Sequence, residues 1–95
     1  MQYLVLVHDN TSTQPTDDEW TEFIQVAVAS GLFRGGSAVG ARQQLGAEAD
    51  PAACAWLTGF MRFDAEEREP LLELLERHPT VVHGGTIELC ELPKT

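Results

Sequence analysis

The chain has 95 residues, of which 43% are hydrophobic, and a net charge of −9 from 15 acidic and 6 basic residues. A chain of this length predicts a single domain over residues 1–95, whose thin core makes self-association a natural way to bury apolar surface. Its only lysine is Lys94, and no basic cluster is present. Binding to nucleic acid or to an anionic membrane surface is therefore disfavoured.

The cysteines and the N-terminus bear on cellular location. Cys54 and Cys90 are the only cysteines, and they lack the close spacing of a metal or redox motif. No basic segment followed by an apolar run opens the chain, so we expect no signal peptide. We expect a cytoplasmic protein with reduced thiols and with neither a metal nor a cofactor.

A strand and a helix are predicted first. Gln2–His8 is a short apolar run typical of a strand that is buried on both faces, and the polar segment Asp9–Pro15 predicts a loop. Thr16 and Glu19 have the spacing of a capping box, which predicts the start of a helix that ends at Gly31. Its apolar stripe is Trp20, Phe23, Ile24, Ala27 and Val28.

Two further strands are predicted in the middle of the chain. Leu32–Gln43 contains several glycines, which indicate a bulge or a close approach of the backbone. A loop is expected over Gln44–Ala53, followed by a strand over Cys54–Phe63. Strand alternation puts one set of its side chains on a common face: Trp56, Thr58, Phe60 and Arg62.

The last predicted elements are a second helix and a fourth strand. Asp64 is the expected N-cap of the helix, with a kink at Pro70 and an end at His78-Pro79. His78 is predicted to act as a cation near the C-terminus of that helix. The strand Val81–Leu92 is expected to contain a bulge at Gly84-Gly85.

The order strand-helix-strand-strand-helix-strand predicts an α+β, ferredoxin-like fold. Its four-stranded antiparallel sheet would have the first and third strands in the centre and both helices on one face. The other face, which carries Trp56 and Phe60, would be uncovered in a monomer. Because exposed apolar patches usually mark interfaces, we predict a homodimer in which two such sheets pack face to face.

The layout resembles the YCII-related family of small dimeric α+β-barrel proteins. The resemblance rests on four short segments: Tyr3–Val7, Ala29–Ala38, Trp56–Phe60, and the tail with His78-Pro79, Gly84-Gly85 and Glu88. Some members have an Asp-Gly-Pro-Phe hairpin, and others a proposed catalytic His and Asp. Here the loop Gln44–Ala53 replaces the hairpin and the first helix contains no histidine, so no catalytic pair carries over.

Two histidines are candidate acid–base residues. His83 precedes two glycines, and a bulge there would turn its side chain toward a cleft. His8 is followed by Asp9, but neighbours on a strand point to opposite faces. The alternatives are that His83 has no role and that His8 is a solvated residue at a strand end.

Arg34, Trp56 and Arg62 are candidate ligand-binding residues, because guanidinium groups bind carboxylates. The alternative is that the arginines, including Arg42, form ion pairs with the many acidic residues.

Two functions follow from these candidates. The first is binding or transformation of a small metabolite in a cleft near the sheet and the dimer boundary, with a histidine as acid or base. The second is a non-catalytic homodimeric interaction or regulatory module. Convergence of His8 or His83 with an arginine in one cleft would favour the first. If all three pointed apart into solvent, the enzyme hypothesis would fail.

Overall fold

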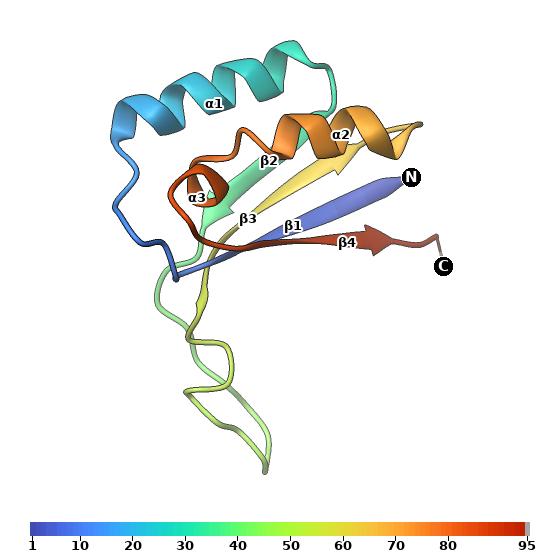
Figure 1. Ribbon diagram of the computed structural model, residues 1–95. Coiled ribbons are helices and arrows are strands. Elements are labelled where there is room, and N and C mark those ends of the chain that lie inside the picture. Colours follow the sequence, from blue (N-terminus) through green and yellow to red (C-terminus); the bar gives the residue numbers. More distant parts are fainter. Residues whose placement is uncertain (95) are drawn as a thin grey trace.

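The computed structural model describes residues 1–94. It has two layers, with the helices packed on one face of a single sheet (Figure 1). The strands pair antiparallel in the order β2-β3-β1-β4. The predicted α+β, ferredoxin-like fold with β1 and β3 in the centre is therefore confirmed. The elements are β1 (Gln2–His8), α1 (Asp17–Ala29), β2 (Phe33–Ala38), β3 (Leu57–Asp64), α2 (Arg68–Leu75), α3 (Pro79–Val82) and β4 (Ile87–Leu92).

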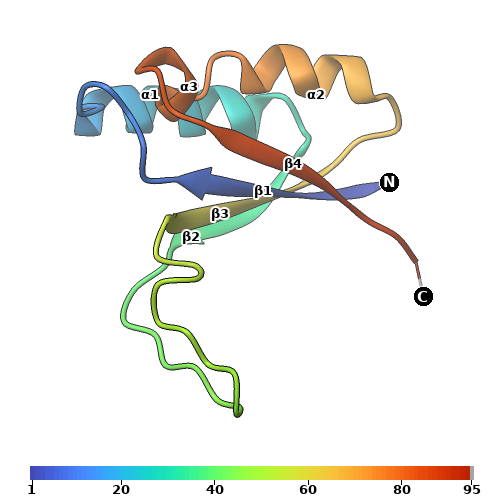
Figure 2. The same cartoon turned by 60° about the horizontal axis from the view of Figure 1, so that its bottom comes forward.

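The core lies between the sheet and the helices, where the alternation of β1 and β3 directs its side chains. Tyr3, Val5 and Val7 of β1 are buried on the helix side, and so are Met61 and Phe63 of β3. The residues between them point to the opposite face, which no helix covers (Figure 2). Among residues 1–94, no helix is long and apolar enough to cross a membrane.

The start and end of α1 follow from local sequence, as predicted. The Thr16 hydroxyl accepts from the Glu19 amide at 3.1 Å, and a Glu19 carboxylate oxygen accepts from the Thr16 amide at 3.0 Å. Gly31 follows the helix with a φ of 77°, a conformation that favours glycine. Val28, which the predicted stripe included, is 61% exposed, whereas the neighbouring Ala27 is fully buried.

β2 and β3 are shorter than predicted because the chain leaves the sheet between them. The expected bulge in β2 is confirmed by a register shift between Phe33 and Gly36. Residues 40–55, here called the arm, are all exposed and extend below the sheet on the side away from the helices (Figures 1 and 2). β3 therefore begins at Leu57 and not at Cys54.

The predicted start of the second helix was wrong. Asp64 is the last residue of β3, where it pairs with Gln2, and α2 begins only at Arg68. Pro70 is consequently the third residue of α2. An amide at that position has no acceptor inside the helix, so proline removes no helical hydrogen bond there.

The predicted start of the last strand was also wrong. Val81 and Val82 belong to the short helix α3, and β4 begins at Ile87. The two glycines form no bulge, since the pairing of β1 with β4 is continuous. Gly84 instead has a φ of 83° in the turn that follows α3.

Candidate functional site

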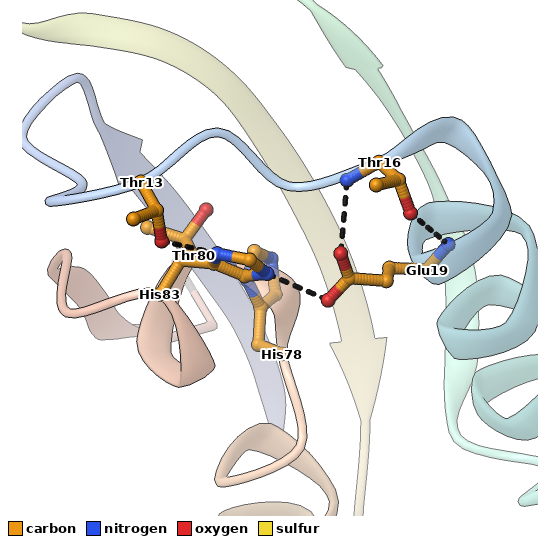
Figure 3. Close-up of polar contacts among 6 residues, drawn as sticks. All are labelled: Thr13, Thr16, Glu19, His78, Thr80 and His83. Carbon is orange, nitrogen blue, oxygen red and sulfur yellow. Dashed lines mark hydrogen bonds and ion pairs between the residues drawn. The ribbon is translucent and has the colours of Figure 1, made fainter.

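The most developed polar network joins three segments at the N-terminal end of α1 (Figure 3). The His83 ring lies between a hydroxyl and a carboxylate. Its Nδ1 is 2.6 Å from Thr13 Oγ1, and its Nε2 is 2.6 Å from Glu19 Oε2. The side chain of His83 is 18% exposed and that of Glu19 is 37% exposed, so the network lies at the surface with its imidazole partly covered.

Local structure holds each member of this network in place. Glu19 belongs to the capping box, so one carboxylate oxygen binds the Thr16 amide while the other faces His83 (Figure 3). His83 caps the C-terminus of α3, and its carbonyl accepts from the Ser12 amide at 2.9 Å. That backbone bond places the loop containing Thr13 beside the imidazole.

The network can move a proton along its length. In the tautomer with hydrogen on Nε2, His83 donates to Glu19 and accepts the Thr13 hydroxyl proton at Nδ1. The hydrogen bond from His83 lowers the pKa of Glu19 below its ordinary value of 4.5, and the Thr16 amide lowers it further. The carboxylate therefore stays ionised at neutral pH and orients the imidazole.

Replacing His83 by alanine is expected to raise the pKa of Glu19 toward 4.5, because the largest contribution to its lowering is removed. The measurement is a pH titration of the Glu19 carboxyl carbon by NMR. Thr13→Val is the matched control, since it removes a hydroxyl from the network but leaves the bond between His83 and Glu19. An unchanged titration in His83→Ala would show that the two side chains do not interact in solution.

His78 lies beside this network but does not belong to it (Figure 3). It is fully buried, with ring centroids 5.0 Å from Trp20 and 4.9 Å from Phe23. Its Nδ1 accepts from the Thr80 amide at 3.1 Å and so caps α3, while Nε2 has no partner within residues 1–94. Burial lowers its pKa from 6.5 to about 4, so the predicted cation is in fact neutral.

An apolar pocket of about 290 Å³ lies between the first half of α1 and the β2–β3 side of the sheet. It exists partly because Gly36 and Gly59 contribute no side chains to it. Trp20 links it to the polar network, since Trp20 follows Glu19 in the first turn of α1. The other residues that line it are Val7, Ile24, Phe33, Ser37, Ala38, Thr58, Phe60 and Met61.

His8 belongs to a second polar contact, on the uncovered face of the sheet. Its Nε2 is 2.6 Å from Glu88 Oε1 on the neighbouring strand, and its ring lies 4.1 Å from that of Trp56. The carboxylate partner is thus Glu88 and not the adjacent Asp9. The cross-strand register allows this, because Leu6 lies opposite Glu88 and His8 and Leu6 share a face.

The structure does not bring an arginine to either histidine. Arg34 donates to the Gly31 and Phe33 carbonyls, and Arg42 donates to the Cys54 and Leu57 carbonyls at the base of the arm. Arg62 is exposed on the uncovered face. Within residues 1–94 no arginine lies within 4.0 Å of a carboxylate, so the expected ion pairs are absent there as well.

Glu19 and Thr13 are members of the network that sequence reasoning missed. The capping-box pattern identified Glu19 only as a helix-start residue. Thr13 lies in a polar loop with no motif. Both contacts with His83 span at least 64 positions of the sequence, and no local pattern predicts them.

Comparison with known proteins identifies no family for this chain. No protein-family model and no curated protein sequence matches it. Among solved structures it is similar to 5-chloro-2-hydroxyhydroquinone dehydrochlorinase (TftG) from Burkholderia phenoliruptrix AC1100, in complex with 2,5-dihydroxybenzoquinone. The match has 13% identity and a TM-score of 0.49, over 100% of this chain and 96% of that one. At this level of similarity, no activity can be transferred from that enzyme.

Proposed function

We propose that this chain is a YCII-related protein that binds or transforms a small molecule in the pocket beneath α1. The observation that carries the proposal is the pocket itself, which has the size and apolar lining typical of small-ligand sites. In this proposal His83 is the acid or base, and Glu19 orients it. The pocket and the network share the first turn of α1, where Glu19 and Trp20 are consecutive.

The lining of the pocket limits the chemistry of its ligand. Among residues 1–94 no charged residue lines it. Strand alternation directs the side chains of Ser37 and Thr58 to the uncovered face of the sheet, so their hydroxyls do not enter the pocket. Burying a charged ligand without a partner would cost several kcal/mol, so a neutral aromatic or aliphatic compound fits best. Trp20 and Phe33 offer ring faces to such a compound.

Filling the pocket is expected to abolish binding of neutral aromatic compounds. We expect 2-naphthol to quench the fluorescence of a Trp56→Phe variant, in which Trp20 is the remaining tryptophan, in a saturable way. Ala38→Phe in that background places a ring in the pocket and should weaken binding at least about tenfold. Ala29→Phe is the matched control, because Ala29 is exposed at the end of α1 and does not line the pocket.

If Ala38→Phe leaves the saturable quenching unchanged, this pocket is not the binding site.

The acid–base role of His83 has a separate test. For compounds that bind, His83→Asn should leave affinity within about threefold of wild type and abolish any conversion that mass spectrometry detects. Conversion at the wild-type rate in that variant would remove His83 from the proposal.

The uncovered face of the sheet favours a second function, homodimerisation, with or without catalysis. Leu4 and Leu6 of β1 and Phe60 of β3 lie half-buried on this face, beside Trp56. In the proposed homodimer these residues meet their copies in a dimeric α+β barrel. The remaining proposed ligand contacts, from His8, Arg34, Trp56 and Arg62, would then lie at the dimer boundary rather than in the pocket.

A further inference from the structure

The arm, residues 40–55, gives the chain an unusually extended shape. The radius of gyration is 14.3 Å and the principal extents are 43 × 38 × 18 Å, whereas a compact chain of this length has a radius of gyration of about 12 Å. Every residue of the arm is exposed. In both views it projects away from the helices, past the uncovered face of the sheet (Figures 1 and 2).

The arm has its own internal order. The Arg42 guanidinium closes its base by donating to the Cys54 and Leu57 carbonyls, each at 2.6 Å. Nearer the tip, the Gln44 amide bridges both backbone groups of Asp50 at 2.5 Å. These bonds join residues of the arm to one another and to the first residue of β3, so part of the conformation of the arm is set before it meets another surface.

The surface of the arm is suited to lying against protein. It is rich in alanine, and Leu45 is 88% exposed, whereas loops that remain in solvent are usually polar. Two carboxylates, Glu48 and Asp50, lie near its tip. Within residues 1–94 neither has a basic group within 4.0 Å.

The uncovered face of the sheet carries the complementary charge. Arg62 lies on this face opposite Leu4, exposed and without a carboxylate partner. It lies toward the end of β3, whereas the arm precedes the start of β3. One copy therefore cannot bring its own arm tip to its own Arg62, but two face-to-face sheets with opposed strand directions can bring each tip to the other's arginine.

We infer that the arm of each copy clasps the uncovered sheet face of a second copy, with Glu48 at its tip against Arg62. The inference rests on the proposed homodimer and adds to it the relative orientation of the two sheets. The contact occurs twice in an isologous dimer. In a chain with a net charge of −9, the cation also reduces repulsion between the copies.

Charge reversal tests the contact. By sedimentation velocity, Arg62→Glu is expected to raise the dimer dissociation constant roughly tenfold, because it sets like charges against each other twice. Adding Glu48→Arg should restore the constant to within about threefold of wild type, since the pair is re-formed with reversed signs. Arg68→Glu is the matched control, with the same charge change on α2, on the far side of the molecule; circular dichroism checks folding of every variant.

The results separate this inference from the proposed homodimer. A wild-type chain that stays monomeric at micromolar concentration would overturn both. A wild-type dimer that Arg62→Glu leaves unchanged, or that Glu48→Arg fails to rescue, would overturn the clasp and leave the homodimer in place. Weakening by Arg62→Glu together with rescue, and no effect of Arg68→Glu, would establish it.

Discussion

Lowering the pH from about 7 to about 4 is expected to destabilise the folded protein by about 3 kcal/mol through His78 alone. Burial lowers the pKa of His78 from 6.5 to about 4. Between these values the unfolded chain binds a proton that the folded chain rejects. The stability is therefore fully present above pH 6.5 and is lost progressively as the pH falls through the folded-state pKa.

The experiment compares urea unfolding of wild type and His78→Phe near pH 7 and near pH 4. At neutral pH the variant should be about 1 kcal/mol less stable, because the Thr80 amide loses its acceptor. Its additional loss on acidification should be smaller than that of wild type by about 3 kcal/mol, since phenylalanine does not titrate.

An equal pH dependence of the unfolding free energy in wild type and His78→Phe would contradict a buried, neutral His78.

Glu19 affects the stability of the fold at lower pH than His78 does. Its pKa is lowered from 4.5, so its contribution is present above that value and is lost only as the pH falls through its folded-state pKa. The contributions of His78 and Glu19 to stability can therefore be distinguished by pH, because the stability due to His78 begins to fall near pH 6.5.

Gly36→Ala is expected to destabilise the protein by about 2 kcal/mol by distorting the pairing of β2 with β3. A methyl group at Gly36 would overlap the Phe60 carbonyl oxygen and would lie 3.0 Å from Met61 Cα. Both are backbone atoms of a central strand, which cannot move aside as a flexible side chain can. Chemical denaturation of the purified variant measures the loss.

Gly40→Ala is the matched control for this effect, because a Cβ there would meet nothing within 4 Å. Its stability should stay within about 0.5 kcal/mol of wild type. A similar loss in both variants would mean that backbone flexibility, and not the close approach of β2 to β3, explains the requirement for glycine.

Local signals in the sequence predicted those elements whose boundaries are set by local chemistry. Thr16 and Glu19 define the start of α1, and Gly31 its end, because capping bonds form between neighbours in sequence. The glycines of β2 indicated its bulge. The uninterrupted apolar run of β1 and the strand order together placed β1 and β3 in the centre of the sheet.

The predicted element boundaries were wrong where a residue type is compatible with two kinds of secondary structure. Pro79 was interpreted as a helix terminator, but proline is equally favourable as the first residue of a helix, and it begins α3. Val81 and Val82 favour a strand by composition and are nevertheless helical. Asp64 suits a helix cap, but pairing with Gln2 keeps it in β3.

For the candidate site, the sequence identified the histidines but not their partners. His83 was selected because it precedes two glycines, and the structure places it against Glu19 for a different reason, namely that α3 ends there. Glu88 likewise replaces Asp9 as the partner of His8 through strand register. Such pairings depend on tertiary packing, which a single sequence does not display.

The two oxygens of Glu19 have a consequence for local unfolding. One holds the first turn of α1 and the other holds His83, 64 positions away. If that turn of the helix frays, the carboxylate leaves the imidazole, but the Ser12 amide still binds the His83 carbonyl and Asn10 still binds Thr86. The first turn of α1 can therefore open locally while the loop between β1 and α1 stays attached to the turn before β4.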